Sequence, residues 1–226
     1  FIVSVGRRSM RRAFQRATAP RRGGGAADEP SVDQAAIDAV FTGFADAEDP
    51  DWMNMEGIAN LCTELTLDPE TDVRVLVLCW KLQSEERPGE ISRAEFVRGM
   101  QALGVDSVAS LKSLLPSLDP GFMDHRRFRD FYRFCFKFNR EDYQKKTLEK
   151  ELVCQLLPMV IADRSPFTEA FIEFLGTASR ARISADEWNS FLEFSKDVSP
   201  DLSLYEDDGA WPSLLDEFVE WSKARQ

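Results

Sequence analysis

Apolar residues recur every three to four positions along most of the chain after residue 31, which is the period of an amphipathic helix. No stretch shows a convincing alternation of period two, so we expect an all-α domain over residues 31–226. The periodicity predicts helices at about 33–45, 106–116, 146–162, 166–178 and 211–223, besides those discussed next.

A short motif typical of helix starts occurs four times. In residues 91–96, Ser92 and Glu95 form a capping box, and the flanking Ile91 and Phe96 form a hydrophobic staple. Residues 183–188 repeat both devices, and weaker copies without the box glutamate lie at 53–58 and 123–128. Four helices should therefore begin in one local geometry, as the second helices of EF-hands do. We predict a compact domain of EF-hand-like helix–loop–helix pieces.

Two further segments are expected to form the core. Residues 68–83 predict a helix with Asp68 as N-cap and Pro69 at its first position, apolar nearly all round and therefore central. The segment 124–138 carries aromatic residues at helical spacing, although their alternation near its end would also fit a short strand. These aromatic residues are Phe128, Phe131, Tyr132, Phe134, Phe136 and Phe138.

Calcium binding is not expected. A calcium loop needs carboxylates at positions 1, 3 and 5, glycine at 6 and a bidentate glutamate at 12. With Ile91 at position 8, positions 1 and 5 are Ser84 and Pro88. The loop that begins at Asp46 lacks the glycine and the final glutamate, and the other two loops hold fewer carboxylates still. We predict no metal and no cofactor, and we interpret the single histidine, His125, as solvated.

Charge is divided unevenly between the start of the chain and the rest. Residues 1–27 carry seven arginines and no acid, so the other 199 residues hold 21 basic and 39 acidic side chains, a net charge of −18. Such a body disfavours nucleic acid. The basic tail, 1–30, is predicted to be disordered, either as a solvated linker or as a transit peptide.

Apolar runs and cysteines bear on the environment of the chain. The longest apolar run, 75–80, is too short to span a membrane, so we expect a soluble protein without membrane association. The four cysteines occur singly and should be reduced, buried thiols of an intracellular protein. They are Cys62, Cys79, Cys135 and Cys154.

The C-terminal part is strongly acidic. Residues 197–220 contain eight acids and no lysine or arginine. In the final helix, Leu214, Leu215, Phe218, Val219 and Trp221 fall within about 80° of Trp211, and the acids fall opposite. This face is either an ordinary solvated surface or a site for a basic partner. The acids are Asp197, Asp201, Glu206, Asp207, Asp208, Asp216, Glu217 and Glu220.

Several of these stretches resemble one protein family. They are Leu67-Asp68-Pro69, Cys79-Trp80-Lys81-Leu82, Ile91-Ser92-Arg93-Ala94-Glu95-Phe96, Asp130-Phe131-Tyr132, Asp186-Glu187-Trp188-Asn189, Asp208-Gly209-Ala210-Trp211-Pro212 and Leu215-Asp216-Glu217-Phe218-Val219-Glu220. In order and approximate spacing they are similar to the defective-in-cullin-neddylation family, whose conserved part is the PONY domain. The resemblance implies an all-helical domain without metal over residues 31–226.

The resemblance also implies a function. The family acts as a non-catalytic scaffold that holds a cullin and the conjugating enzyme of neddylation, and promotes transfer of the ubiquitin-like modifier to a cullin lysine. Its cullin-binding residues, which meet a basic winged-helix region, would be Asp186, Ala210 and Asp216. Its pocket for the acetylated N-terminal Met of the conjugating enzyme would be lined by Met55, Ile58, Val75, Leu78, Cys79, Ile91, Phe138, Leu156 and Met159. We expect a monomer in the cytoplasm and nucleus.

Three alternatives remain at this point. One is an EF-hand-like calcium-responsive regulatory protein that binds a basic helix or peptide. Another is an enzyme that uses the acidic cluster, although no catalytic residues stand out in the sequence. The third is a scaffold that inhibits the transfer instead of promoting it.

Overall fold

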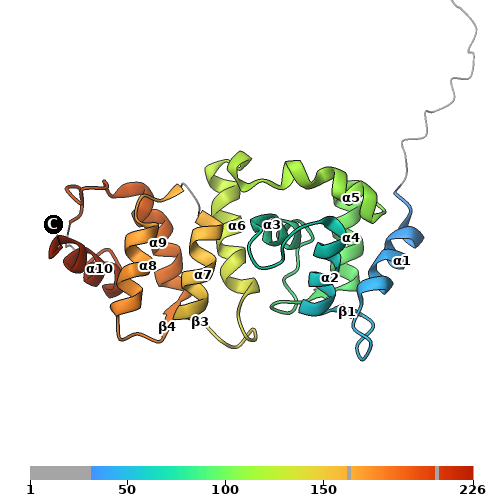
Figure 1. The fold of residues 1–226 in the computed structure, drawn as a ribbon, viewed down its shortest axis with the longest axis horizontal. Helices are drawn as coiled ribbons and strands as arrows, with labels where there is room; N and C mark the ends of the chain where they lie inside the picture. The colour runs from blue at the N-terminus through green and yellow to red at the C-terminus, as the bar shows by residue number, and fades with distance from the viewer. Residues whose placement is uncertain (1–31, 162–163, 207–208, 226) are drawn as a thin grey trace, which may run out of the picture. The chain divides into compact units, whose positions relative to one another are not determined.

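The computed structural model describes residues 32–161, 164–206 and 209–225, and Figure 1 shows their arrangement. The first helices are α1 (Gln34–Phe44), α2 (Met55–Leu65), α3 (Val73–Lys81), α4 (Arg93–Leu103) and α5 (Val108–Leu114), followed by short 3₁₀ turns η1 (Leu115–Leu118) and η2 (Pro120–Phe122). The later helices are α6 (His125–Phe138), α7 (Lys150–Ile161), α8 (Thr168–Thr177), α9 (Ala185–Asp197) and α10 (Ser213–Lys223). The predicted helical class is confirmed. The predicted tail, 1–30, lies outside the described residues.

The sequence shows no strand pattern, whereas the structure contains two short antiparallel pairs of strands. β1 (Trp52–Met53) pairs with β2 (Ile91–Ser92), and β3 (Thr147–Glu149) pairs with β4 (Arg182–Ser184). Strands of two or three residues are too short to produce a readable alternation in a sequence. Each of the four strands runs directly into a helix, or is separated from it by one residue, so the pairs align helix starts.

The four predicted helix starts are confirmed in their capping geometry. At each one, a side-chain oxygen of the N-cap residue accepts a hydrogen bond from the backbone N–H three residues later. Both predicted capping boxes are complete. The N-cap residues are Asn54, Ser92, Asp124 and Ser184.

The central helix begins later than predicted. Asp68 was predicted as its N-cap, but α3 starts at Val73 with Asp72 as N-cap. The Asp68 carboxylate instead accepts a hydrogen bond from the backbone N–H of Glu70 in a turn. Asp72 caps the helix through the N–H of Arg74 and also binds its guanidinium. The central position is confirmed, since the residues from Val75 to Cys79 are buried.

The aromatic segment is entirely helical, which settles the ambiguity between helix and strand. α6 contacts α3, α7 and α9. The rings of Tyr132 and Trp188 stack at 4.5 Å. The Tyr132 hydroxyl donates to the backbone oxygen of Trp188, and the Trp188 indole N–H donates to the backbone oxygen of Tyr132, each at 3.0 Å. These paired hydrogen bonds satisfy polar groups that burial would otherwise leave without a partner.

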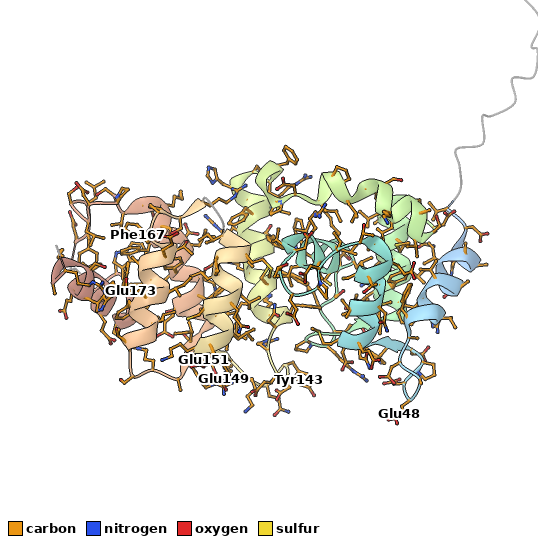
Figure 2. All side chains as sticks on the ribbon, viewed as in Figure 1. Glu48, Tyr143, Glu149, Glu151, Phe167 and Glu173 are labelled. Atoms are coloured by element: carbon orange, nitrogen blue, oxygen red, sulfur yellow. The ribbon has the colours of Figure 1, made fainter. Side chains whose placement is uncertain are left out.

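A second aromatic cluster holds the C-terminal helices together. Phe167, labelled in Figure 2, lies just before α8, and its ring is 5.2 Å from Phe194 of α9 and 6.1 Å from Phe218 of α10. The apolar face predicted for the final helix is confirmed, since Leu214, Leu215, Phe218 and Val219 are buried. That helix starts at Ser213, two residues after the expected Trp211.

The cysteines are free thiols, and three of the four are buried as predicted. Burial raises the pKa of Cys62 to about 11, and it raises the pKa values of Cys79 and Cys135 as well. Cys154 is half-buried. No helix among the described residues is both long and apolar enough to cross a membrane.

Glu95 is a fully buried carboxylate that joins α4 to the loop before it. Its Oε1 accepts hydrogen bonds from the backbone N–H groups of Glu85 at 2.6 Å and Glu86 at 2.9 Å. Its Oε2 accepts from the N–H of Ser92 at 2.8 Å. Three amide donors therefore surround a carboxylate that, at position 12 of a calcium loop, would bind the cation. The loop is held by hydrogen bonds from its own backbone.

We expect Glu95→Ala to lower the free energy of unfolding by about 2–3 kcal/mol, because buried amide donors lose a charged acceptor. Glu95→Gln should cost less, since it keeps one acceptor oxygen. The midpoint and slope of urea unfolding measure the effect. Glu64→Ala, at an exposed position of α2, is the control and should change stability by less than about 0.5 kcal/mol. Equal stability of Glu95→Ala and the control would contradict this role.

Candidate functional site

The starts of α9 and α10 are joined by one arginine. Arg180, in the loop before β4, donates from Nη1 to Glu187 Oε1 at 2.6 Å. Its Nη2 donates to Glu217 Oε1 at 2.9 Å and to Ser213 Oγ at 3.0 Å. Since Glu187 lies in the first turn of α9 and Ser213 begins α10, the two helix starts lie within reach of one guanidinium.

The three residues expected to bind the cullin lie at or next to these helix starts. Asp186 is exposed in the first turn of α9, adjacent to Glu187. Asp216 is partly buried in the first turn of α10, adjacent to Glu217. Ala210 is exposed in the loop that leads to α10. We call these three residues the acidic site.

Arg180 pairs with Glu187 and Glu217 and not with the two aspartates of the acidic site. No basic side chain lies within 4.0 Å of a carboxylate oxygen of Asp186 or Asp216 among the residues that are described. Asp216 Oδ1 accepts a hydrogen bond from the Tyr205 hydroxyl at 2.7 Å, which orients the carboxylate without cancelling its charge. Both aspartates can therefore attract a basic surface.

The acids of the stretch 197–220 are not equivalent. Hydrogen bonds from the hydroxyls of Ser199 and Ser203 hold the pKa of Asp201 down to about 2, so this carboxylate stabilises its own turn. Asp197 is paired with Lys196. Asp207 and Asp208 lie outside the described residues. The surface that could meet a partner is thus smaller than the run of acids in the sequence.

The fold also brings cations to this stretch that the sequence pattern did not reveal. Besides Arg180, Lys223 places its ammonium 5.2 Å from the centre of the Tyr205 ring. The unbroken negative sign of residues 197–220 is therefore a property of the sequence and not of the surface. Nothing in the local sequence of Arg180 points to this role, because its two carboxylate partners come from different helices.

A second candidate site is an apolar groove of about 820 Å³ between α2, α3, the end of α6, and α7. Six of the nine residues expected to form a methionine pocket line it, from four different helices. They are Met55, Ile58, Val75, Phe138, Leu156 and Met159.

The other three expected pocket residues do not line this groove. Leu78, Cys79 and Ile91 are at most 2% exposed and belong to the core. Their place in the pocket stays a prediction, since a helix that is apolar all round does not reveal in its sequence which of its faces meets an open space. The groove is instead completed by residues that the sequence did not indicate, namely Ala59, Pro69, Glu70, Thr71, Asp72, Leu76, Asn139, Leu152 and Gln155.

Polar residues among those that line the groove make part of its edge polar. Glu70 and Asn139 lie on it, and Asp72 is held by Arg74, whose hydrogen bond lowers the pKa of the Asp72 carboxyl. Met55 is 60% exposed, which is unusual for an apolar residue of its size. An apolar groove with a few polar groups is the form of site that takes a small apolar anchor.

Comparisons with known proteins agree with these features. A family model described as cullin binding matches residues 110–221. DCN1-like protein 5 of Rattus norvegicus is 36% identical over 171 residues, which cover 76% of this chain and 71% of that protein. The human DCN1-like protein 5 is 35% identical over 171 residues, with the same shares of each chain.

A DCN1-like protein 3 gives a longer match. The protein of Xenopus laevis is 36% identical over 194 residues, which cover 84% of this chain. The chain spans 63% of the length of that relative. With the cullin-binding match, the capped all-helical fold and identities of this size over most of its length, the chain belongs to the defective-in-cullin-neddylation family, the DCN1-like proteins.

Proposed function

We propose that the protein is a non-catalytic scaffold that binds a cullin at the acidic site and a neddylation conjugating enzyme at the apolar groove, and so promotes transfer of the ubiquitin-like modifier to a cullin lysine. The observation that carries this proposal is the bridge through Arg180. It holds together two helix starts, each bearing an aspartate that has no basic side chain within 4.0 Å in the part of the chain that the structure describes.

The chemistry of the acidic site suits a basic winged-helix region of a cullin. Asp186 and Asp216 supply two negative charges, and the small side chain of Ala210 would let the partner's backbone approach closely. Electrostatic complementarity of this kind sets orientation and the rate of association. Because α9 and α10 contribute nothing to the lining of the groove, both partners could bind at once.

The groove suits an acetylated N-terminal methionine. Burying a methionine side chain contributes roughly 1.5–3 kcal/mol. A free α-ammonium would have to lose its hydration on entering, whereas acetylation removes that charge. Six apolar residues would contact the anchor, and the polar edge would meet the following residues of the peptide.

A scaffold with these two sites needs no catalytic residue of its own. Holding the thioester of the conjugating enzyme near the target lysine raises its effective concentration and fixes its orientation. The protein would act as a monomer in the cytoplasm and nucleus. We also propose that its helix–loop–helix pieces are EF-hand-like without metal, as the two strand pairs and the capped helix starts suggest.

The calcium-sensor alternative receives less support. Its best candidate ligand, Glu95, already accepts three backbone hydrogen bonds. Asp46 is likewise occupied by the backbone N–H groups of Glu48 and Asp49, which lower the pKa of its carboxyl. Binding a cation would require these hydrogen bonds to break.

Charge reversal at the acidic site should strongly weaken cullin binding. We expect Asp186→Lys or Asp216→Lys to weaken binding of a cullin's C-terminal region by about 2 kcal/mol or more, roughly 30-fold in Kd. Asp216→Asn keeps an acceptor for Tyr205 and should cost less. Titration calorimetry measures the affinities, and circular dichroism checks the fold.

The matched control is Glu48→Lys, which makes the same change of charge at the exposed loop between α1 and β1 (Figure 2). Its affinity for the cullin should stay within about twofold of the wild type. If the acidic-site variants and Glu48→Lys bind equally well, the assignment of the acidic site is wrong.

An acetylated peptide that begins with methionine should bind more tightly than its free-amine form, by about tenfold or more at pH 7. Because a free α-amine has a pKa near 8, raising the pH to about 9 should strengthen binding of the free-amine peptide and leave the acetylated one unchanged. Fluorescence anisotropy measures both.

Two variants connect this preference to the groove. Met159→Glu places a charge in the lining and should remove binding of the acetylated peptide. Glu151→Ala, on α7 outside the lining, should bind it as the wild type does. Equal affinities of the two peptide forms would rule out an acetyl-methionine pocket.

A reconstituted neddylation reaction separates promotion from inhibition. At concentrations of cullin and conjugating enzyme below saturation, the wild-type protein should accelerate modifier transfer, and Asp216→Lys should remove most of the acceleration. Slower transfer on addition of the wild-type protein would favour the inhibitory scaffold.

A further inference from the structure

Helix α6 has two opposite faces. One face buries Phe128, Phe131, Tyr132 and four further residues in the core. The other face is exposed and basic, in a protein whose described part is otherwise acidic. Neither the acidic site nor the groove uses this exposed face; Phe138, which lines the groove, belongs to the buried residues of the helix.

The exposed face carries four cations in a line, which we call the basic stripe: Arg126, Arg129, Arg133 and Lys137. All four are exposed. At 100° per residue they fall within about 80° of arc, and the stripe is about 16 Å long. One acid, Asp130, lies at its edge.

Among the described residues, only one of the four cations forms an ion pair, although Arg126 also attracts the nearby carboxylate of Asp124. Arg129 Nε lies 3.0 Å from Glu193 Oε1 of α9. For Arg126, Arg133 and Lys137, no carboxylate lies within 4.0 Å across the described parts of the chain. Three cations are therefore available to a partner.

An exposed aromatic residue lies just before the stripe. Phe122, at the end of η2, is 80% exposed. The turn that presents it is held by Arg164, whose Nη2 donates to the backbone oxygens of Pro120 at 2.9 Å and Met123 at 2.8 Å. The Arg164 guanidinium also lies 4.1 Å from the centre of the Phe128 ring. A rigid turn that exposes an aromatic side chain loses little entropy on binding.

Phe122 lies four residues before Arg126 in the chain, and exposed aromatic and arginine side chains are enriched in protein–protein interfaces. The sign of the stripe requires an acidic partner, and its length limits the kind of partner. Residues 28–226 have a net charge of −18, so a long polyanion that ran past the ends of the stripe would meet repulsive surface. A short acidic helix, with carboxylates every three or four residues along one face, matches both the spacing and the length.

We propose that the basic stripe and Phe122 form a docking surface for an acidic helix of a partner protein, separate from the acidic site and the groove. The carboxylates of that helix would pair with Arg126, Arg133 and Lys137. An apolar pocket at one end of the partner would take Phe122.

The probe for this surface is a fluorescein-labelled helical peptide of about 18 residues with glutamates every third or fourth position along one face. A peptide of the same composition with the glutamates spread around the helix is its control. We expect the first to bind about fivefold or more tightly, and its affinity to fall as salt is raised. Equal binding of the two peptides, or no binding, would overturn the proposal.

Matched variants separate the stripe from net charge. R126E/R133E/K137E should weaken binding of the matched peptide by about tenfold or more. R98E/K112E/K223E changes the net charge equally at exposed positions elsewhere and should weaken binding by less than about threefold. Phe122→Ser changes no charge and should leave the affinity for this peptide, which offers no apolar pocket, within about twofold of the wild type.

Two further measurements keep this surface distinct from other sites and ligands. The stripe variant, R126E/R133E/K137E, should bind the cullin region and the acetylated peptide with the same affinities as the wild type. Binding of the acidic peptide is measured without a cullin or a conjugating enzyme, so failure of the proposed function would not change that measurement. Short duplex DNA and vesicles that contain phosphoinositide should bind more weakly than the matched peptide. Tighter binding to either would assign the stripe to a polyanion and overturn the proposal.

Discussion

The arrangement of the C-terminal half depends on the carboxylate of Glu187. This side chain is only 9% exposed, and its two carboxylate oxygens accept hydrogen bonds from different partners. Oε2 accepts from the backbone N–H of Ser184 and closes the start of α9, while Oε1 binds Arg180. Arg180 also donates hydrogen bonds to Ser213 and Glu217 of α10. The capping residue of α9, Glu187, is therefore connected to α10 through this arginine. Without Glu187, the partly buried guanidinium would lose its best partner and α10 its electrostatic attachment.

Glu95 forms the same kind of capping box at the start of α4, but its second carboxylate oxygen has different partners. It occupies the equivalent position in α4, yet its free oxygen turns to the amides of Glu85 and Glu86 within its own loop. The N-terminal copy therefore stabilises one loop, whereas the C-terminal copy positions a surface. The pKa of Arg180 is raised by its hydrogen bond to Glu217, so the guanidinium stays charged over the physiological pH range. One short sequence motif thus serves stability in one half and the geometry of a candidate binding site in the other.

Features decided within a few residues could be predicted from the sequence, and features decided by tertiary contacts could not. The four N-caps followed from Asn54, Ser92, Asp124 and Ser184 because capping involves only the next three residues. The start of α3 is an exception, since both Asp68 and Asp72 can accept from a backbone N–H two residues later, Asp68 in a turn and Asp72 at the helix start. The two strand pairs were too short to leave a pattern. Leu78 and Cys79 could not be separated from Val75 as groove residues, because burial and exposure to a groove produce the same apolar pattern.

The distribution of charge supports several partners on one small protein. α10 buries apolar residues and presents acids, whereas α6 buries aromatic residues and presents cations. At physiological ionic strength, exposed charges are screened beyond about 8 Å, so separate faces of opposite sign act independently. The proposed scaffold would hold a cullin at the acidic site and a conjugating enzyme at the groove, so those two partners would not compete for one face. The acids of α10 would repel the acidic helix proposed for the basic stripe, and the cations of α6 would repel a basic cullin region, so opposite charges would keep these two partners apart as well.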